Sequence, residues 1–148
     1  MTDSAVADTP IPGAVLFACN LNQVRSPMAA ALLQRRLGGR LYVDSCGLQH
    51  GEGIDPFVVA VMAEVGIDLS EQVSKTFADL EPDSFDLIVA LTPEAQQRAQ
   101  AVSRGRAVEA EFWPTDDPTA EGGSRDQRLA AYRRVRDEIA RRIAARFG

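Results

Sequence analysis

The stretch AVLFACNLNQVRSP, residues 14–27, decides how the chain begins to fold and where an anion could bind. Its apolar first part, residues 14–18, is typical of a buried strand. Ser26 is a favoured N-cap and Pro27 a favoured first helical residue, so we expect a helix to begin here. The backbone N–H groups of a turn between a strand and a helix attract anions, and the helix dipole adds to this attraction. The stretch therefore predicts an anion-binding loop from Cys19 to Ser26.

Outward from this loop, the chain alternates predicted strands with predicted helices. Apolar runs predict three further strands, at residues 41–43, 85–91 and 107–113. Helical patterns follow these strands, at residues 55–65, 92–103 and, with apolar side chains three and four positions apart, 129–147. Alternating strands and helices form a parallel sheet with helices on both faces. We therefore expect an α/β fold, a three-layer sandwich built on a four-stranded parallel sheet.

The length of 148 residues suits one domain, which we place at residues 13–148 after a flexible tail at residues 1–12. Two Cys and one His cannot complete a four-ligand zinc site of Cys and His alone, nor a dense disulfide framework. The net charge of −5 argues against nucleic acids and anionic membranes as partners. The chain has no run of 18 apolar residues and no signal-peptide pattern. We expect a cytoplasmic protein with reduced thiols, either a monomer or a weak dimer.

The charge is unevenly distributed along the chain. Residues 125–148 hold 8 arginines and 3 acidic residues, although the whole chain is negative. Because arginines on a helix usually form a solvated face, we expect these arginines to be exposed.

The predicted loop carries a candidate nucleophile and a candidate anion ligand. The field of the loop and of the following helix favours a thiolate, so Cys19 is predicted to be a nucleophile at neutral pH. Arg25 can offer its planar fork to two oxygens of a tetrahedral dianion. Ser26 can cap the helix and donate a hydrogen bond to the sulfur. The spacing alone is also compatible with a buried Cys that ends a strand and a surface Arg that opens a helix.

A candidate general acid lies in the segment Asp116-Asp117-Pro118, beyond the fourth predicted strand. A thiophosphate forms easily only when the leaving oxygen is protonated, which an Asp on this edge of the sheet could do. An Asp-Pro pair alone is more often a simple turn. Together with Cys19 and Arg25, however, Asp117 would complete a set for phosphoryl transfer through a cysteinyl-phosphate. That set needs no metal and no cofactor.

The chain resembles the low-molecular-weight protein tyrosine phosphatases along almost its whole length. Five segments carry the resemblance in the same order: residues 15–29, 44–47, 66–70, 85–89 and 117–118. The resemblance implies that Cys19 is the nucleophile, that Arg25 binds phosphate and that Asp117 is the acid, on a sheet of strand order 2-1-3-4. It implies that Asn22 and Ser26 support the loop. The substrate-binding residues would be those of the loop: Asn20, Leu21, Asn22, Gln23, Val24, Arg25 and Ser26.

Several positions depart from the pattern of that family. Val24 stands where a second Cys is usual, so a reversible disulfide within the loop cannot form. Leu21 replaces a common glycine, and Gln23 occupies a position that helps to select the substrate. Thr119 and Ala120 replace the aromatic residues that often follow Asp-Pro, so an aromatic wall for phosphotyrosine is partly missing.

A sister group with the same fold reduces arsenate, and residues 112–114 and 132–139 look closer to that group. Its thioredoxin-coupled members relay oxidation through two further Cys, which correspond here to Thr92 and approximately to Ala99. The remaining thiol, Cys46, is expected to serve packing. An external small thiol would need Cys19 alone.

Three hypotheses follow. The first is a phosphatase acting on a phosphorylated protein or a small phosphoester, with phosphotyrosine or a related phosphoester or phosphoramidate as its substrate. The second is an arsenate reductase that uses an external small thiol. The third is a phosphate-binding or phosphoprotein-binding module without turnover.

Overall fold

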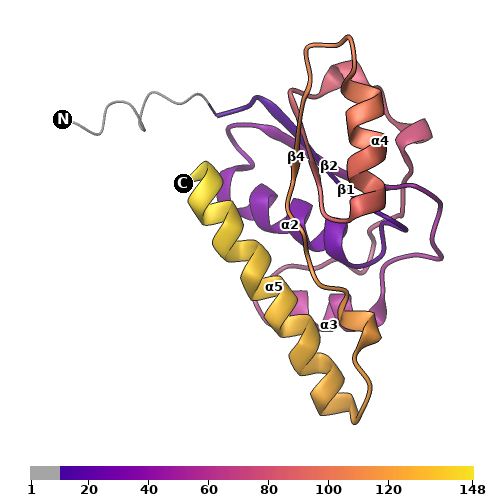
Figure 1. Ribbon diagram of the computed structural model, residues 1–148. Coiled ribbons are helices and arrows are strands. Elements are labelled where there is room, and N and C mark those ends of the chain that lie inside the picture. Colours follow the sequence, from indigo (N-terminus) through magenta and orange to yellow (C-terminus); the bar gives the residue numbers. More distant parts are fainter. Residues whose placement is uncertain (1–10) are drawn as a thin grey trace.

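The computed structural model describes residues 11–148, so most of the predicted tail at residues 1–12 lies outside the described residues. Within them, four strands alternate with four α-helices (Figure 1). The strands are β1 (Ala14–Cys19), β2 (Tyr42–Gly47), β3 (Leu87–Ala90) and β4 (Glu109–Phe112). The helices are α2 (Arg25–Leu37), α3 (Pro56–Ala63), α4 (Pro93–Ser103) and α5 (Arg125–Phe147). Three short 3₁₀ turns lie at Phe77–Asp79, Pro82–Ser84 and Pro118–Ala120.

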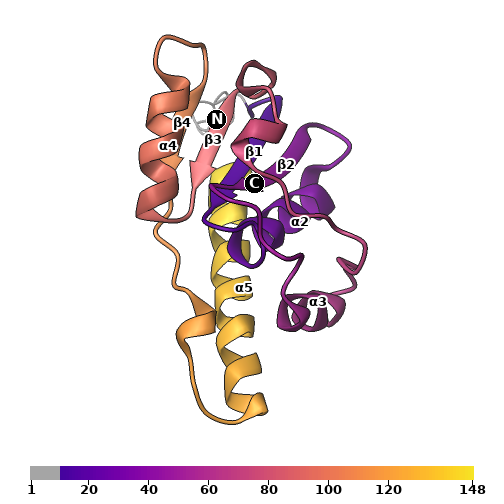
Figure 2. The ribbon, with the colours of Figure 1, turned by 90° about the vertical axis from the view of Figure 1, so that its right-hand side faces the viewer.

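The strands form one parallel sheet in the order β2-β1-β3-β4, which confirms the expected topology. One face of the sheet is covered by α2, α3 and α5, and the other by α4 and the turns that precede β3. Figures 1 and 2 show α4 and α5 on opposite sides of the sheet. The molecule is therefore the three-layer α/β sandwich that the sequence predicts.

The central strand β1 explains why its sequence is apolar without alternation. Val15 and Phe17 point into the core with α2 and α5, whereas Leu16 and Ala18 point into the core with α4. All six residues of β1 are buried. A strand covered on both faces by helices has no solvent side, so every position is apolar.

Several element boundaries differ from the sequence predictions. Strand β4 spans only Glu109–Phe112 of the predicted residues 107–113, and α5 begins at Arg125, four residues before the predicted start. Strand β2 continues from Tyr42 to Gly47 because residues 44–47 pair with the end of β1, beyond the predicted end at 43. Strand β3 is shorter than residues 85–91 and pairs only over Leu87–Ala90. Helix α3 ends at Ala63, two residues before the predicted end.

The start of α2 also corrects a prediction. The helix begins at Arg25, and the residue that precedes it is Val24, which makes no side-chain cap. Ser26 is therefore not the N-cap: it lies inside the first turn, and its hydroxyl is used in the loop instead. Since the loop backbone is held from outside the helix, α2 can begin without a capping side chain.

The arginines of α5 are not all solvated, contrary to the expectation of an exposed basic face. Arg136 is only 9% exposed. Its Nη1 donates to the carbonyl of Val61 at 2.7 Å and to Glu64 Oε1 at 2.9 Å, and these bonds connect α5 to α3.

In residues 11–148, no helix is long and apolar enough to span a membrane.

Candidate active site

The loop between β1 and α2 lies at the carboxyl edge of the sheet, where ligands of open α/β sheets bind. Cys19 ends β1 and is 3% exposed. Residues 20–24 leave the strand, and Arg25 starts the helix. In Figure 2 this loop lies between α3 and the segment that follows β4. The fold therefore places the candidate nucleophile beside the start of a helix, as the sequence predicts.

Asn22 is the hub of the loop. It is fully buried, and it adopts a left-handed backbone conformation with φ of 55°. Its Nδ2 donates to Ser26 Oγ at 2.8 Å and to Ser45 Oγ at 2.9 Å. Its Oδ1 accepts from the backbone N–H of Lys75 at 2.8 Å, and its carbonyl accepts from Ser74 Oγ at 3.0 Å. Four partners from three segments thus fix the strained residue.

The hydroxyl of Ser26 lies between two acceptors. Its oxygen is 3.0 Å from Cys19 Sγ and 3.2 Å from the carbonyl oxygen of Cys46. A hydroxyl has one proton, so it can donate to only one of them at a time. When Cys19 is a thiol, the S–H donates to Ser26 Oγ and the hydroxyl donates to the carbonyl. When Cys19 is a thiolate, the hydroxyl can turn and donate to the sulfur, which stabilises the nucleophile.

Two glycines allow neighbouring segments to approach the loop closely. A Cβ on Gly47 would lie 2.7 Å from the backbone nitrogen of Asn22. A Cβ on Gly51 would lie 2.7 Å from the carbonyl oxygen of Leu21. Both contacts are shorter than any side chain tolerates against backbone, so these positions require glycine.

Arg25 connects the loop to the segment that holds the candidate acid. Its Nη1 donates to the carbonyl of Thr115 at 3.0 Å, and its Nη2 lies 3.9 Å from Asp117 Oδ2. Asp117 Oδ1 accepts from the N–H and hydroxyl of Thr119, at 2.9 and 2.6 Å. One carboxylate oxygen is thus held by the turn, and the other faces the guanidinium. Asp116 and Asp117 both line a groove beside α5, but only Asp117 lies within 4 Å of Arg25.

Two further side chains of the loop, those of Asn20 and Gln23, are hydrogen-bonded to neighbouring segments. Asn20 Oδ1 accepts from Thr92 Oγ1 at 2.7 Å, and Gln23 Nε2 donates to the carbonyl of Gly53 at 2.9 Å. Val24 is buried in the core, and Leu21 is 42% exposed. The groups of the loop that suit an oxyanion are therefore its backbone N–H groups and Arg25. The roles predicted for Cys19, Arg25 and Asp117 and for the substrate-binding loop residues stay predictions.

Cys46 does not face Cys19. In the sheet, Cys46 pairs with Ala18, and both side chains lie in the core under α4, whereas Cys19 lies in the core on the other face. Cys46 is fully buried, and burial raises the pKa of its thiol strongly. Both cysteines are free. Because the two thiols lie on opposite faces, a disulfide between them would require β1 or β2 to turn over.

Several partners of the loop could not be found from the sequence. They come from segments far along the chain: Ser74 and Lys75 at the hub, Thr92 at Asn20, and the Thr115 carbonyl at Arg25. Only Ser45 could have been expected near the loop from the sequence, because it lies in one of the segments that carry the resemblance.

Within residues 11–148, no group of three or more His, Cys, Asp and Glu side chains gathers as metal ligands would.

Comparison with known proteins shows the family of the chain. The profile of the family described as low molecular weight phosphotyrosine protein phosphatase matches residues 14–146. An arsenate reductase of Halalkalibacterium halodurans is 36% identical over 129 residues, which cover 87% of this chain and 91% of that protein. The chain therefore belongs to the low-molecular-weight phosphotyrosine protein phosphatase family.

Solved structures similar to this chain include an arsenate reductase and a tyrosine phosphatase. The structure "An arsenate reductase in the phosphate binding state" superposes with a TM-score of 0.69 at 27% identity, over 89% of this chain and 94% of that one. The tyrosine phosphatase AmsI of Erwinia amylovora superposes with a TM-score of 0.73 at 22% identity, over 93% and 95% of the two chains. The second likeness concerns the fold alone.

Proposed function

We propose that this protein reduces arsenate to arsenite, with Cys19 as its one redox-active thiol and an external small thiol as the reductant. The observation that carries the proposal is the likeness to proteins named arsenate reductase, one of which is 36% identical over 87% of this chain. The isolation of Cys19 supports an external reductant, because the only other cysteine lies on the opposite face of the sheet. This choice departs from our first hypothesis from the sequence, which was a phosphatase.

In the first step, the Cys19 thiolate attacks the arsenic atom of arsenate. Backbone N–H groups of residues 20–25 and the guanidinium of Arg25 bind the oxygens, as they suit a tetrahedral dianion. A sulfur–arsenic bond forms, and one arsenate oxygen leaves as water after it takes a proton from Asp117. Arg25 is 14% exposed, so its charge acts in a partly desolvated site.

In the second step, an external thiolate attacks the sulfur of Cys19. A disulfide forms between Cys19 and the small thiol, the sulfur–arsenic bond breaks, and its electron pair stays on arsenic as arsenite. A second small thiol then attacks the mixed disulfide and releases the Cys19 thiolate. In total, one arsenate and two thiols yield arsenite, one small-molecule disulfide and water.

A phosphatase is the second candidate, and the match to the family described as low molecular weight phosphotyrosine protein phosphatase favours it. Asp117 Oδ2 lies 3.9 Å from Arg25 Nη2, where a carboxylic acid could protonate the leaving oxygen of a phosphoester. The same loop would bind the phosphoryl group, and water would hydrolyse the cysteinyl-phosphate. This activity needs no thiol other than Cys19.

One experiment separates the two activities. Wild type, Cys19→Ser and Asp117→Ala are assayed for arsenite formation with a small thiol and for hydrolysis of p-nitrophenyl phosphate. We expect thiol-dependent arsenite formation that Cys19→Ser abolishes and Asp117→Ala reduces about 100-fold, the usual size of a general-acid effect. Asp116→Ala is the matched control and should retain activity.

Other outcomes would contradict the proposal. Hydrolysis of p-nitrophenyl phosphate without arsenite formation would make the phosphatase the correct function. Binding of phosphate without either turnover would identify the protein as a phosphate-binding module.

A further inference from the structure

Two arginines on the first turn of α5 have no acidic partner. Of the 8 arginines of this helix, six form ion pairs with carboxylates. Arg125 and Arg128 are exposed and pair with no carboxylate of residues 11–148. In a protein of net charge −5, two neighbouring cations without partners are an obvious surface for an anion.

Both arginines lie over one aromatic ring. The guanidinium carbon of Arg128 is 4.7 Å from the centre of the Phe57 ring, and that of Arg125 is 5.7 Å from it. Tyr132 packs against the same ring in a T-shaped arrangement, with centroids 5.2 Å apart. Stacking on a ring uses the face of a guanidinium and leaves its in-plane N–H groups free, so each arginine can still bind a carboxylate with two hydrogen bonds.

This platform of Phe57, Arg125 and Arg128 is attached to the loop of Cys19. The N–H of Phe57 donates to Asp55 Oδ1 at 2.8 Å, and the N–H of Asp55 donates to the carbonyl of Gln23 at 3.1 Å. Tyr132 donates its hydroxyl to Asp55 Oδ2 at 2.7 Å. Phe57 belongs to the first turn of α3, so these hydrogen bonds hold its backbone within a few residues of the candidate anion loop.

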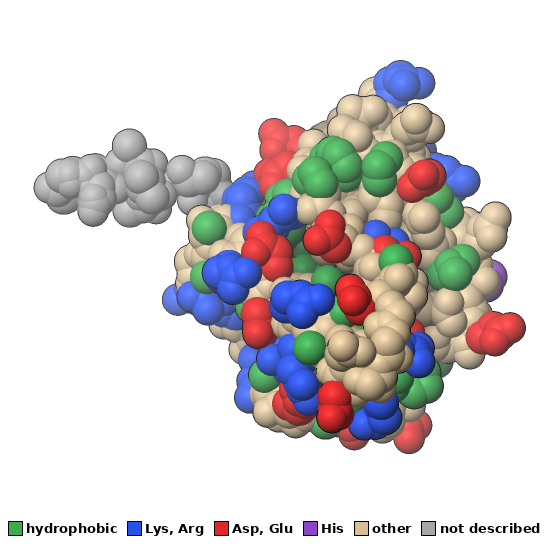
Figure 3. All heavy atoms as spheres, turned by 60° about the horizontal axis from the view of Figure 1, so that its bottom comes forward, with side chains coloured by type: hydrophobic (Ala, Val, Ile, Leu, Met, Phe, Trp, Pro, Cys, Tyr) green, Lys and Arg blue, Asp and Glu red, His purple; other side chains and the backbone are tan. Residues whose placement is uncertain are grey.

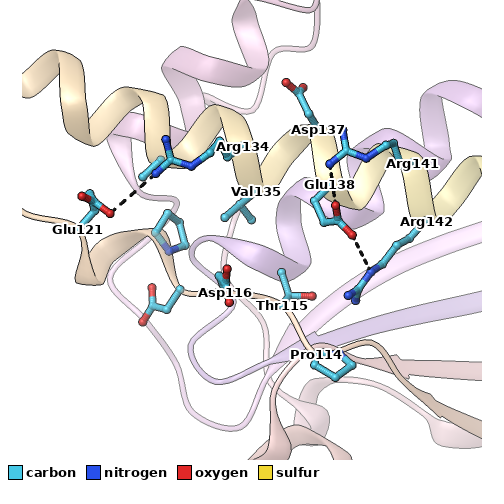
Figure 4. A pocket seen from close by; sticks show the side chains of 13 residues that line it. Pro114, Thr115, Asp116, Glu121, Arg134, Val135, Asp137, Glu138, Arg141 and Arg142 are labelled. Atoms are coloured by element: carbon cyan, nitrogen blue, oxygen red, sulfur yellow. Dashed lines mark hydrogen bonds and ion pairs between the residues drawn. The ribbon is translucent and has the colours of Figure 1, made fainter.

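The neighbouring groove between the 114–121 segment and α5 does not offer the same free charge. It has a volume of about 530 Å³, and its arginines are engaged by acids (Figure 4). Glu138 accepts from Arg141 at 2.6 Å and from Arg142 at 3.2 Å, and Arg134 lies 3.8 Å from Glu121. The surface seen in Figure 3 likewise intermingles acidic and basic side chains. Unpaired positive charge on α5 is thus confined to Arg125 and Arg128 among the described residues.

We infer that Arg125 and Arg128, stacked on Phe57, bind the carboxylate of the small thiol that reduces the arsenate adduct on Cys19. The inference rests on the proposed function and names the class of its reductant, an anionic low-molecular-weight thiol. The oxyanion has its own candidate ligands in the loop and Arg25, so we assign an anion bound at this platform to the second reactant. Binding there holds the thiol at the site while its sulfur approaches Cys19.

The test compares a thiol that carries carboxylates with its ester, in which the carboxylates are blocked. Arsenite formation is measured with glutathione and with glutathione diethyl ester, which keeps the thiol and lacks both carboxylates. In the double variant Arg125→Gln/Arg128→Gln, we expect the KM for glutathione to rise about tenfold, as expected when charge-assisted hydrogen bonds to a carboxylate are lost. The KM for the diethyl ester and the KM for arsenate should not change. Arg104→Gln, an exposed arginine at the end of α4, is the control.

A second measurement does not depend on turnover. Calorimetry measures binding of S-methylglutathione, which cannot react, to wild type and to the double variant. We expect binding that the double variant loses and that Arg104→Gln retains. Equal values of KM for the two thiols, or an equal response of both to the double variant, would overturn the inference. So would S-methylglutathione that fails to bind wild type. Absence of arsenite with either thiol, while S-methylglutathione binds at the two arginines, would instead refute the proposed function.

Discussion

At the scale of single residues, the site is organised by polar atoms that do not themselves react. Ser26 shares one proton between Cys19 Sγ and the carbonyl of Cys46, and Asn22 donates to the same hydroxyl oxygen. The Asn22 amide thus occupies a lone pair of Ser26 and orients its proton away from Asn22. The state of the nucleophile therefore depends on a hydroxyl that the sequence had suggested as a helix cap.

This arrangement predicts the effect of Ser26→Ala. The variant removes the donor to the Cys19 thiolate, and a hydrogen bond to a charged group contributes roughly 1.5–3 kcal/mol. We expect the rate of alkylation of Cys19 by iodoacetamide at pH 7 to fall about tenfold or more. Cys46 is fully buried, so it contributes little to the signal, and Cys19→Ser gives the background. An unchanged rate in Ser26→Ala would mean that the hydroxyl donates only to the carbonyl of Cys46.

At the scale of elements, β2 supports the loop through the missing side chain of Gly47. Gly47→Ala would place a methyl group 2.7 Å from the backbone nitrogen of Asn22, where nothing can yield except the loop itself. We expect a loss of stability of about 1–3 kcal/mol, typical of overpacking, together with weaker binding of phosphate. Gly39→Ala is the matched control, because a Cβ there meets nothing within 4 Å. Denaturant unfolding and phosphate titration measure the two effects. Equal stability and equal phosphate affinity of the two variants would contradict the close approach of Gly47 to the backbone of Asn22.

The contact between α3 and α5 makes a second prediction at this scale. Hydrogen bonds from Arg133 and Arg136 lower the pKa of Glu64 to about 2. A carboxyl whose pKa is depressed by folding stabilises the fold above its unfolded pKa, near 4.5, and this contribution disappears as the pH falls toward 2. We expect Glu64→Gln to lower the melting temperature at pH 7 by a few degrees and to flatten the loss of stability between those pH values.

The control for this prediction is Glu52→Gln, because Glu52 is exposed and forms no ion pair within residues 11–148. Thermal unfolding followed between pH 7 and 2 measures both variants. If Glu64→Gln and wild type have the same melting temperature at every pH, solvent screens the ion pairs of Glu64 with Arg133 and Arg136 completely.

At the scale of the whole molecule, the sequence predicts the architecture well because each element carries a local pattern. The apolar run at residues 14–18 indicates a strand buried on both faces, and the spacing of apolar residues from 129 to 147 indicates α5. Strand order came from the resemblance and is confirmed. The loop between β1 and α2 was located correctly, because the apolar pattern of the strand ends at Cys19.

The sequence could not predict what holds the loop in shape, because those contacts join residues distant along the chain. The backbone N–H of Lys75 binds an Asn 53 residues earlier, and the carbonyl of Thr115 binds an Arg 90 residues earlier. Backbone groups have no residue-type signature, so no motif could have indicated them. The burial of Arg136 escaped prediction for a similar reason: its partners, Val61 and Glu64, lie on another helix.

The position of the two cysteines on opposite faces of the sheet has a consequence for oxidative damage. Peroxide would convert the Cys19 thiolate to a sulfenic acid, a species that a neighbouring thiol normally rescues as a disulfide. Cys46 lies behind the sheet and cannot reach it. Only a thiol from solution can therefore reduce the sulfenic acid of Cys19. The fraction of protein with a reduced Cys19 would depend on the concentration of such thiols.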